Sequence, residues 1–299
     1  MSEPEVDPTS PTSAGAQIRA AENVLAQAGV ASPSYDAAEL LAHVLGVSRA
    51  GLPLVRAVSA EQAADFDALV QQRASRAPLQ HLTGSAGFRY VELRVGPGVF
   101  VPRPETELLA GWAVEQARAA GEVPVVVDLC TGSGAIALSV ATEVPEAEVY
   151  AVELDPKALV WAHDNLAGSG VRLHEGDMAE ALHELDGTVD VVVCNPPYIP
   201  LDAWESVAPE ARDHDPALAL WSGDDGLVAL RALEVAAARL LRPGGVVGAE
   251  HADAQGETAP GVFSASGRWT QVRDHPDLAG RARYLTARLR RDGHPGVAR

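Results

Sequence analysis

The sequence has few cysteines, almost no lysine and no long apolar run. Among its 299 residues only Cys130 and Cys194 are cysteines, and Lys157 is the single lysine. Two cysteines cannot form a disulfide framework, and no Cys/His cluster has zinc-ligand spacing, so no metal is expected. No run approaches the roughly 18 consecutive apolar residues of a membrane span, and the N-terminus lacks the layout of a signal peptide. We therefore expect a cytoplasmic protein with no membrane association.

Positive charge is also scarce. The chain has 23 Lys and Arg against 41 Asp and Glu, a formal net charge of -18 at pH 7. Proteins that bind nucleic acid tightly usually have a basic face that displaces counterions from the phosphates. This balance argues against DNA or RNA as the direct partner, although a local basic patch can exist inside an acidic total.

The N-terminal part of the chain is expected to be a short tail followed by a small helical domain. Residues 1–13 contain three prolines, three acids and almost no apolar residues, so they cannot offset the entropy cost of ordering and are expected to be disordered. Over residues 14–76 apolar residues recur at helical spacing, and a Ser-x-x-Gln capping box opens the third of three helices; the second is expected over 36–45. Glycines punctuate residues 77–107, which are expected to form a β-hairpin linker.

From residue 108 to residue 299 the pattern changes to alternating strands and helices. Five apolar strands are expected at 125–129, 149–153, 171–174, 191–194 and 246–250. Two further segments, 269–273 and 283–289, are close enough in the chain to pair as an antiparallel hairpin at one sheet edge. The alternation predicts an α/β fold, a doubly wound seven-stranded sheet covered by helices on both faces.

A glycine-bearing turn follows the first of these strands. The strand ends in Asp128-Leu129 and continues through Cys130-Thr131-Gly132-Ser133-Gly134 into a helix. Glycines there let the backbone approach a ligand, at the strand end where doubly wound sheets bind nucleotides. A plain structural turn remains the alternative, and the spacing departs from the G-x-G-x-x-G pattern that seats a dinucleotide pyrophosphate.

Acidic side chains follow the next two strands. Glu153 ends the second strand, about 20 residues beyond the turn, where an acid can accept hydrogen bonds from both ribose hydroxyls. After the third strand, Asp177 can accept from an exocyclic adenine amine, and Met178 can pack on the ring. Together with the turn, these residues predict adenosine binding without a phosphate, as in S-adenosylmethionine.

The tetrapeptide Asn195-Pro196-Pro197-Tyr198 follows the fourth strand and predicts the acceptor site. An amide nitrogen is a poor nucleophile because its lone pair is delocalised. The Asn195 side-chain oxygen and the Pro196 carbonyl can each accept one hydrogen of an NH2 group and so orient it. Two prolines stiffen the loop, and Tyr198 can lie against a flat amide or base. The four residues are therefore predicted to be catalytic.

These elements, in this order, resemble a class I methyltransferase of the amino-nitrogen group. The wider match, over about residues 16–290, is to the HemK/PrmC family. It is carried by Thr83-Gly84, Pro102-Arg103-Pro104-Glu105-Thr106-Glu107, Asp213-His214-Asp215-Pro216, Gly223-Asp224-Asp225-Gly226-Leu227, Glu250-His251 and Asp277-Leu278-Ala279-Gly280-Arg281. The Pro-Arg-Pro-Glu-Thr element separates this family from nucleic-acid enzymes that share Asn-Pro-Pro-Tyr.

The resemblance implies methylation of the glutamine N5 in the Gly-Gly-Gln tripeptide of class 1 peptide chain release factors, with S-adenosylmethionine as cofactor. It implies that Thr131 to Gly134, with Cys130 at the start of the same loop, contact the methionine part of the cofactor. Glu153 would contact the ribose, and Asp177 with Met178 the adenine.

The resemblance also assigns the acceptor side. Asn195, at the border with the cofactor, and Pro196 would hold the substrate glutamine, and the helical domain would hold the body of the release factor. A monomer is expected. Three cofactor positions depart from common family residues: Cys130 replaces a frequent Gly, Glu153 a frequent Asp, and Met178 an occasional aromatic residue.

Other functions remain open from the residues alone. Asn195 would present the same acceptor to an adenine amine in nucleic acid, or to a glutamine of a ribosomal protein. A noncatalytic binding module and a nicotinamide oxidoreductase are more distant alternatives. Asp213-His214-Asp215 has the composition of a metal site, but adjacent residues rarely converge on one ion, so a loop that closes over the acceptor is expected instead.

Overall fold

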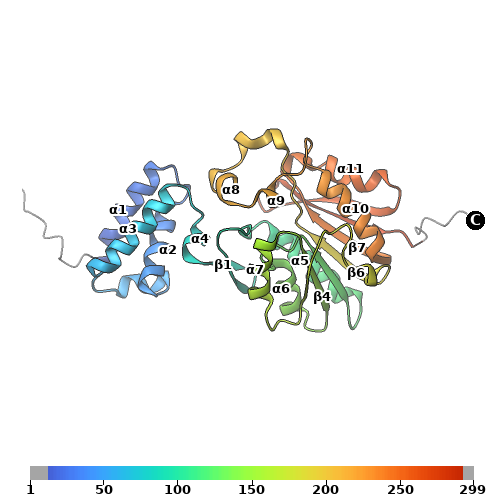
Figure 1. Ribbon diagram of the computed structural model, residues 1–299, viewed down its shortest axis with the longest axis horizontal. Coiled ribbons are helices and arrows are strands. Elements are labelled where there is room, and N and C mark those ends of the chain that lie inside the picture. Colours follow the sequence, from blue (N-terminus) through green and yellow to red (C-terminus); the bar gives the residue numbers. More distant parts are fainter. Residues whose placement is uncertain (1–12, 292–299) are drawn as a thin grey trace, which may run out of the picture. The chain divides into compact units, whose positions relative to one another are not determined.

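The computed structural model describes residues 13–291 (Figure 1). The expected disordered tail therefore lies outside the described residues except for Ser13, as do the last eight residues of the expected C-terminal domain, 292–299. The chain divides into two compact units. One contains the described residues up to Ser85 together with Ala208–His214, and the other contains Ala86–Val207 and the described residues from Asp215 onward.

The first unit is helical. Its helices are α1 (Ala14–Gln27), α2 (Pro33–Leu45), the 3-10 helix η1 (Arg49–Leu54), α3 (Ala60–Ala74), α4 (Leu79–Thr83) and α8 (Pro209–His214). Their buried faces meet in one core around Leu25, Leu40, Leu41 and Phe66.

Local signals set the boundaries of these helices. Ser59 and Gln62 form the predicted capping box at the start of α3. Gly46 ends α2 in the left-handed conformation, with φ of 63°. The second helix begins at Pro33 and not at Asp36 as expected. Proline suits the first position of a helix, because the N–H groups of the first turn have no partner within the helix and proline has no N–H to leave unpaired.

Helix α8 belongs to this unit although it lies about 130 residues further along the chain. Glu210 accepts hydrogen bonds from Arg73 at 3.0 Å and from Arg76 at 2.8 and 2.7 Å. Arg73 also donates to buried Asp36 at 2.7 Å. The group of charges thus joins α2, α3 and α8.

The second unit begins with a hairpin and continues as an α/β sheet. Its strands are β1 (Ser85–Phe88), β2 (Val91–Arg94), β3 (Val125–Leu129), β4 (Glu148–Glu153), β5 (Arg172–Glu175), β6 (Val189–Cys194), β7 (Leu241–Glu250), β8 (Trp269–Pro276) and β9 (Ala282–Leu289). Its helices are α5 (Thr106–Ala120), α6 (Ala135–Glu143), α7 (Pro156–Leu166), η2 (His183–Leu185), η3 (Leu201–Ser206), α9 (Ala217–Leu220), α10 (Val228–Leu240), η4 (Asp253–Gln255) and α11 (Thr258–Ala265).

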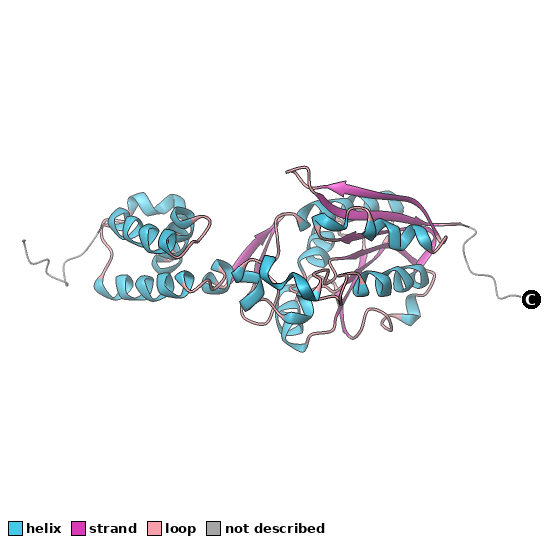
Figure 2. Ribbon diagram, turned by 90° about the horizontal axis from the view of Figure 1, so that it is seen from above, coloured by secondary structure: helices cyan, strands magenta, loops and turns pink. Residues whose placement is uncertain are grey.

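Seven strands form the main sheet, in the order β5-β4-β3-β6-β7-β9-β8. Figure 2 shows the strands in magenta and the helices that cover them in cyan. The pairs among β3 to β7 are parallel, whereas β9 is antiparallel to both β7 and β8. Helices α5, α6 and α7 pack on one face of this sheet, and α10 and α11 pack on the other. The predicted doubly wound fold, with an antiparallel hairpin at one edge, is confirmed.

Strand β7 and helix α11 also differ from the sequence-based expectation. Strand β7 begins at Leu241, five residues before Val246, and it crosses Pro243 and two glycines. Because of this irregular start, the pairing of β7 with β6 changes register between Val189 and Val191. Helix α11 was not expected, because its Pro260 and Gly261 are typical helix breakers.

Candidate active site

The carboxyl ends of four parallel strands meet at one edge of the sheet. Leu129 of β3 pairs with Val152 of β4 and with Cys194 of β6. Further along the same edge, Glu153 pairs with Glu175 of β5. The register therefore brings the residues that follow these strands, including the glycine turn and Asn195, to one edge of the sheet.

The turn between β3 and α6 has an unusual backbone. Cys130, Gly132 and Gly134 all have positive φ, of 60°, 58° and 86°. A Cβ at Gly134 would come within 3.0 Å of Leu166 on α7, so close packing requires glycine there. A Cβ at Gly132 would meet nothing within 4 Å, so this part of the turn borders open space that a ligand can use.

Asp128, in the part of β3 next to the turn, holds this turn through hydrogen bonds. Its Oδ2 accepts hydrogen bonds from the Thr131 hydroxyl at 2.6 Å and from the Ala137 amide at 3.1 Å. Its Oδ1 is buried without a hydrogen-bond partner in the described part of the chain. Burial and, to a smaller extent, the charge of Glu153 raise the pKa of Asp128 to about 7, against the opposing effect of these hydrogen bonds.

Glu153 is held at the end of β4 by three backbone amides. Its Oε2 accepts from Gly132 at 2.7 Å, and its Oε1 accepts from Leu154 at 2.9 Å and Asp155 at 2.8 Å. The side chain thus bridges the glycine turn and the loop after β4. Burial raises the pKa of Glu153 although the amide hydrogen bonds oppose the shift.

The loop after β5 brings Asp177 and Met178 to the same edge. Asp177 is exposed, and its Oδ1 accepts from the Ala179 amide at 2.9 Å, which orients the carboxylate. Met178 is half-buried, and its sulfur lies 3.8 Å from the Cys130 sulfur. The third predicted cofactor element therefore contacts the first.

Thr131 and Ser133 are buried within the turn, and Asn165 of α7 supports it from outside. The Asn165 side chain donates to the Ser133 carbonyl at 2.9 Å and accepts from the Arg94 amide at 2.8 Å. Asn165 links the end of β2 to the glycine turn, a contact that nothing in the sequence indicated.

The predicted acceptor loop, residues 195–198, follows β6. Pro196 is buried, whereas Asn195, Pro197 and Tyr198 are half-buried. The Gln255 side chain donates to the Tyr198 carbonyl at 3.1 Å and so holds the loop from behind.

Gly226 supports the same loop and cannot be replaced without cost. It has φ of 71°, and a Cβ there would collide with the carbonyl oxygen of Tyr198.

Two buried residues beside this loop were not predicted as site residues. Glu250, at the end of β7, accepts from the Tyr198 hydroxyl at 3.1 Å and from the Thr106 hydroxyl at 2.6 Å. Thr106 in turn accepts from the Asn195 amide at 3.4 Å. Both residues belong to sequence motifs noted above, and this was the signal that could have identified them. Their contacts could not be predicted, because 144 positions separate Thr106 from Glu250 and 89 separate Thr106 from Asn195.

Burial shifts the titration of this group. It raises the pKa of Tyr198 well above its ordinary value, as does the nearby charge of Glu250, so the phenol stays neutral and can donate. Burial also raises the pKa of Glu250, an effect opposed by hydrogen bonds from Thr106 and Tyr198 and by the charge of Arg283.

Asp215 is part of an ion pair in this structure. It accepts from Arg103 at 2.6 Å, and its side chain is fully buried. Burial raises the pKa of Asp215 to about 6 in spite of the arginine. Among residues 13–291 no group of three or more His, Cys, Asp and Glu side chains is arranged to hold a metal.

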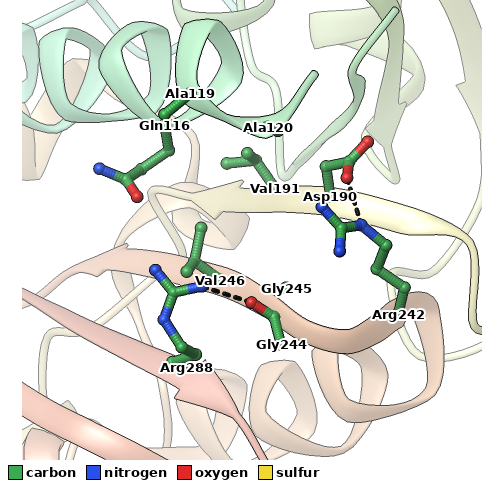
Figure 3. Close-up of a pocket in the computed structure, with 10 residues that line it drawn as sticks. All are labelled: Gln116, Ala119, Ala120, Asp190, Val191, Arg242, Gly244, Gly245, Val246 and Arg288. Atoms are coloured by element: carbon green, nitrogen blue, oxygen red, sulfur yellow. Dashed lines mark hydrogen bonds and ion pairs between the residues drawn. The ribbon is translucent and has the colours of Figure 1, made fainter. Parts of the chain in front are cut away.

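A cavity of about 100 Å³ lies elsewhere, at the amino ends of the strands (Figure 3). Arg242 points to Asp190 and Arg288 to the Gly244 carbonyl at its wall. These contacts are at the opposite ends of β6 and β7 from Asn195 and Glu250, so this cavity is not the predicted cofactor site.

In the described ranges, no helix is long and apolar enough to cross a membrane.

Two family models match the chain. The PrmC N-terminal domain matches residues 17–84, and the methyltransferase domain matches residues 126–214.

Several known proteins are similar over most of the chain. The release factor glutamine methyltransferase of Streptomyces coelicolor is 56% identical over 278 residues, covering 91% of this chain and 97% of that protein. Its counterpart in Mycolicibacterium smegmatis is 48% identical, covering 90% and 95%. The 4-amino-L-phenylalanine/4-methylamino-L-phenylalanine methyltransferase of Streptomyces pristinaespiralis is 44% identical over 211 residues, covering 69% and 72%.

Proposed function

Because this chain belongs to the family of release factor glutamine methyltransferases, we propose that it methylates the glutamine N5 in the Gly-Gly-Gln tripeptide of class 1 peptide chain release factors. The methyl donor is S-adenosylmethionine. The observation that supports this most is the placement of the acceptor loop at Asn195 beside the glycine turn at Gly132, at one edge of the sheet. Donor and acceptor loops in this arrangement can bring a methyl group and an amide nitrogen together.

The residues of the cofactor site fit S-adenosylmethionine. Gly132 borders open space, so backbone and ligand can approach closely there. The Glu153 carboxylate is fixed by three amides, and of its roughly four lone-pair sites one, on Oε2, remains for a ribose hydroxyl. Asp177 keeps its Oδ2 for the adenine amine, because Oδ1 already accepts from Ala179. When bound, the cofactor supplies an electrophilic methyl group on its sulfonium.

Buried negative charge also suits a cationic ligand. Asp128 and Glu153 both have raised pKa values because they are buried at the turn. A positively charged sulfonium and ammonium nearby would favour their ionised forms. Cofactor binding is therefore expected to lower both pKa values.

The acceptor loop holds the substrate amide by its two hydrogens. Asn195 Oδ1 and the Pro196 carbonyl each accept one hydrogen, which fixes the plane of the NH2 group and directs its nitrogen toward the methyl group. Both acceptors also stabilise positive charge that develops on this nitrogen during transfer. After transfer the methylated nitrogen releases one proton to solvent water, so no dedicated general base is needed. Pro197 keeps the loop stiff, and Tyr198 covers the face of the amide.

We assign the remaining roles by region. Residues 14–76 recognise the body of the release factor, residues 77–107 link the two parts, and residues 108–299 carry out the transfer. The match of a PrmC N-terminal domain model to residues 17–84 supports a family-specific role for the helical part. We propose that the reaction takes place in the cytoplasm and that the enzyme acts as a monomer. We also propose that it does not bind nucleic acid directly, which the net charge of -18 supports.

One experiment tests this function directly. The purified protein is incubated with methyl-labelled S-adenosylmethionine and a purified release factor, in parallel with a factor whose tripeptide glutamine is replaced by alanine. Label on the intact factor alone is expected. Label on neither factor, with cofactor binding verified, would contradict the proposal, and parallel reactions with ribosomal protein, bulk nucleic acid and 4-aminophenylalanine would identify the acceptor class.

A further inference from the structure

Glu250 is a buried carboxylate whose two oxygens serve two different elements of the acceptor site. Its Oε2 accepts from Thr106 at the start of α5, and its Oε1 accepts from Tyr198 in the acceptor loop. The residue is 1% exposed. No Arg, Lys or His forms an ion pair with it in the described part of the chain, although Arg283 contributes positive charge nearby.

Such an arrangement costs folding stability. A buried charge without an ion pair is expensive, and two hydroxyl donors compensate only in part. An amide or apolar residue would fit the interior more cheaply. The carboxylate is therefore better explained by what it does to Thr106 and Tyr198 than by packing.

The hydrogen-bond direction at Thr106 follows from counting hydrogens. A threonine hydroxyl has one hydrogen. Glu250 in its ionised form can only accept, so the 2.6 Å contact directs this hydrogen toward the Glu250 Oε2 atom. Toward Asn195, Thr106 therefore offers only lone pairs. It must accept from the Asn195 NH2 group, at 3.4 Å.

This direction decides which end of the Asn195 amide faces the substrate. With its NH2 group on Thr106, the side chain has its Oδ1 turned away from Thr106 and free to accept from the substrate amide. The reversed amide would present NH2 to the NH2 group of the substrate, and the two would repel. The relay from Glu250 through Thr106 thus sets the polarity of the acceptor site.

We propose that Glu250 and Thr106 are positioning residues for methyl transfer: they fix the Asn195 amide so that its oxygen faces the acceptor, and Glu250 also fixes the Tyr198 ring. This inference rests on the proposed function, since it assumes that Asn195 holds an acceptor NH2 group. Neither residue touches the reacting atoms.

The test compares Thr106→Val, Thr106→Ser and Glu250→Gln in the wild-type and Asn195→Ala backgrounds. In the wild-type background, loss of one charge-linked hydrogen bond is expected to lower kcat about ten- to hundredfold for Thr106→Val and Glu250→Gln. Thr106→Ser keeps the hydroxyl and is expected to stay within about threefold of wild type. Affinity for S-adenosylhomocysteine and the KM for the release factor are expected to change little, and the melting temperature of Glu250→Gln to stay equal or rise.

The Asn195→Ala background separates positioning from a structural role. If Thr106 acts through Asn195, then Thr106→Val lowers single-turnover methyl transfer by less than about twofold once Asn195 is absent. The same loss in both backgrounds would overturn the proposal. So would an unchanged kcat for Thr106→Val in an otherwise wild-type enzyme that labels the release factor. A wild-type enzyme that labels no release factor would instead overturn the proposed function.

A second measurement needs no activity. The side-chain amide signal of Asn195 in a nitrogen-15 spectrum is assigned by its loss in Asn195→Ala. We expect this signal to move in Thr106→Val and to return close to its wild-type position in Thr106→Ser. An identical signal in all three proteins would show that Thr106 does not hold Asn195, and would overturn the inference whatever the acceptor is.

Discussion

Arg76 and Glu210 form a two-point ion pair although 134 positions separate them: Nε donates to Oε1 at 2.8 Å and Nη2 to Oε2 at 2.7 Å. Burial alone would raise the pKa of Glu210, but hydrogen bonds from Arg76 and Arg73 outweigh it and lower the pKa to about 2. The carboxylate therefore stabilises the folded helical unit in its ionised form.

Glu210→Gln is expected to lower the free energy of unfolding by about 1 to 2 kcal/mol at pH 7, since the carboxylate is only partly shielded from water. Because the folded pKa lies below the ordinary value of 4.5, this stabilisation is present above pH 4.5 and is lost as the pH falls toward 2. Urea unfolding of variant and wild type from pH 3 to pH 7 measures it. Glu205→Gln, at an exposed position, is the matched control, and an equal effect of both substitutions would refute the assignment.

Asn195→Ala removes one of the two proposed acceptors for the substrate NH2 group. We expect kcat to fall by about two to three orders of magnitude, as for the loss of a transition-state hydrogen bond in other enzymes. Cofactor affinity, measured by calorimetry with S-adenosylhomocysteine, is expected to stay nearly constant. An unchanged kcat would exclude the acceptor role.

Gly226→Ala is expected to disturb the acceptor loop, because the new Cβ would collide with the Tyr198 carbonyl. We expect kcat to fall by about a hundredfold or more through misplacement of Asn195, with cofactor binding retained. Gly168→Ala is the control: its φ of 76° imposes a similar backbone cost, but its Cβ would meet nothing within 4 Å. If both variants lose the same activity, backbone strain and not the collision is responsible.

Cys130 has φ of 60°, a conformation that costs a non-glycine residue about 1 to 2 kcal/mol. Cys130→Gly relieves this strain but adds about 0.5 to 1 kcal/mol of chain entropy to the unfolded state. The variant is therefore expected to be as stable as wild type or slightly more stable, whereas Cys130→Val should be strongly destabilised because a β-branched residue rarely adopts positive φ. Thermal unfolding of both variants and the wild type tests this. A marked loss of stability in Cys130→Gly would show that the contact of the Cys130 side chain with Met178 outweighs the backbone strain.

Asp128→Asn tests the raised pKa at the cofactor turn. The folded pKa of about 7 exceeds the ordinary 3.8, so ionisation opposes folding, and the wild type loses stability relative to the variant as the pH rises from 3.8 to 7. The full effect is at most about 4 kcal/mol, by conversion of the pKa difference. Urea unfolding at several pH values measures the difference between the two proteins. Asp202→Asn at an exposed position should show no such trend, and a constant difference for Asp128→Asn would contradict the raised pKa.

Local patterns in the sequence were sufficient for the elements that local rules determine. The Ser59–Gln62 capping box, the Gly46 helix end and the strand that ends at Leu129 all follow from neighbouring residues. Parallel pairing then places the residues after each strand at one edge, which is why the cofactor turn and Asn195 could be predicted as parts of one site.

Contacts between distant segments could not be predicted in this way. Thr106 lies at the start of a helix and Glu250 at the end of a strand. The periodicity of apolar residues predicts these elements, but it does not predict that the two side chains contact each other. The start of β7 at Leu241 depends on its pairing with Val189 of β6 across a register shift, and the place of Glu210 depends on arginines far away in the chain. Such features require the tertiary structure, because their signals are pairwise and not local.

The inclusion of Ala208–His214 in the helical unit has a consequence for how this protein can be divided. A fragment that stops at Ser85 would keep Arg73 and Arg76 but leave them without Glu210, and a fragment that starts at Ala86 would carry Glu210 without its arginines. The two units are therefore not interchangeable modules, and exchange of the N-terminal part between relatives must carry the internal segment Ala208–His214 with it.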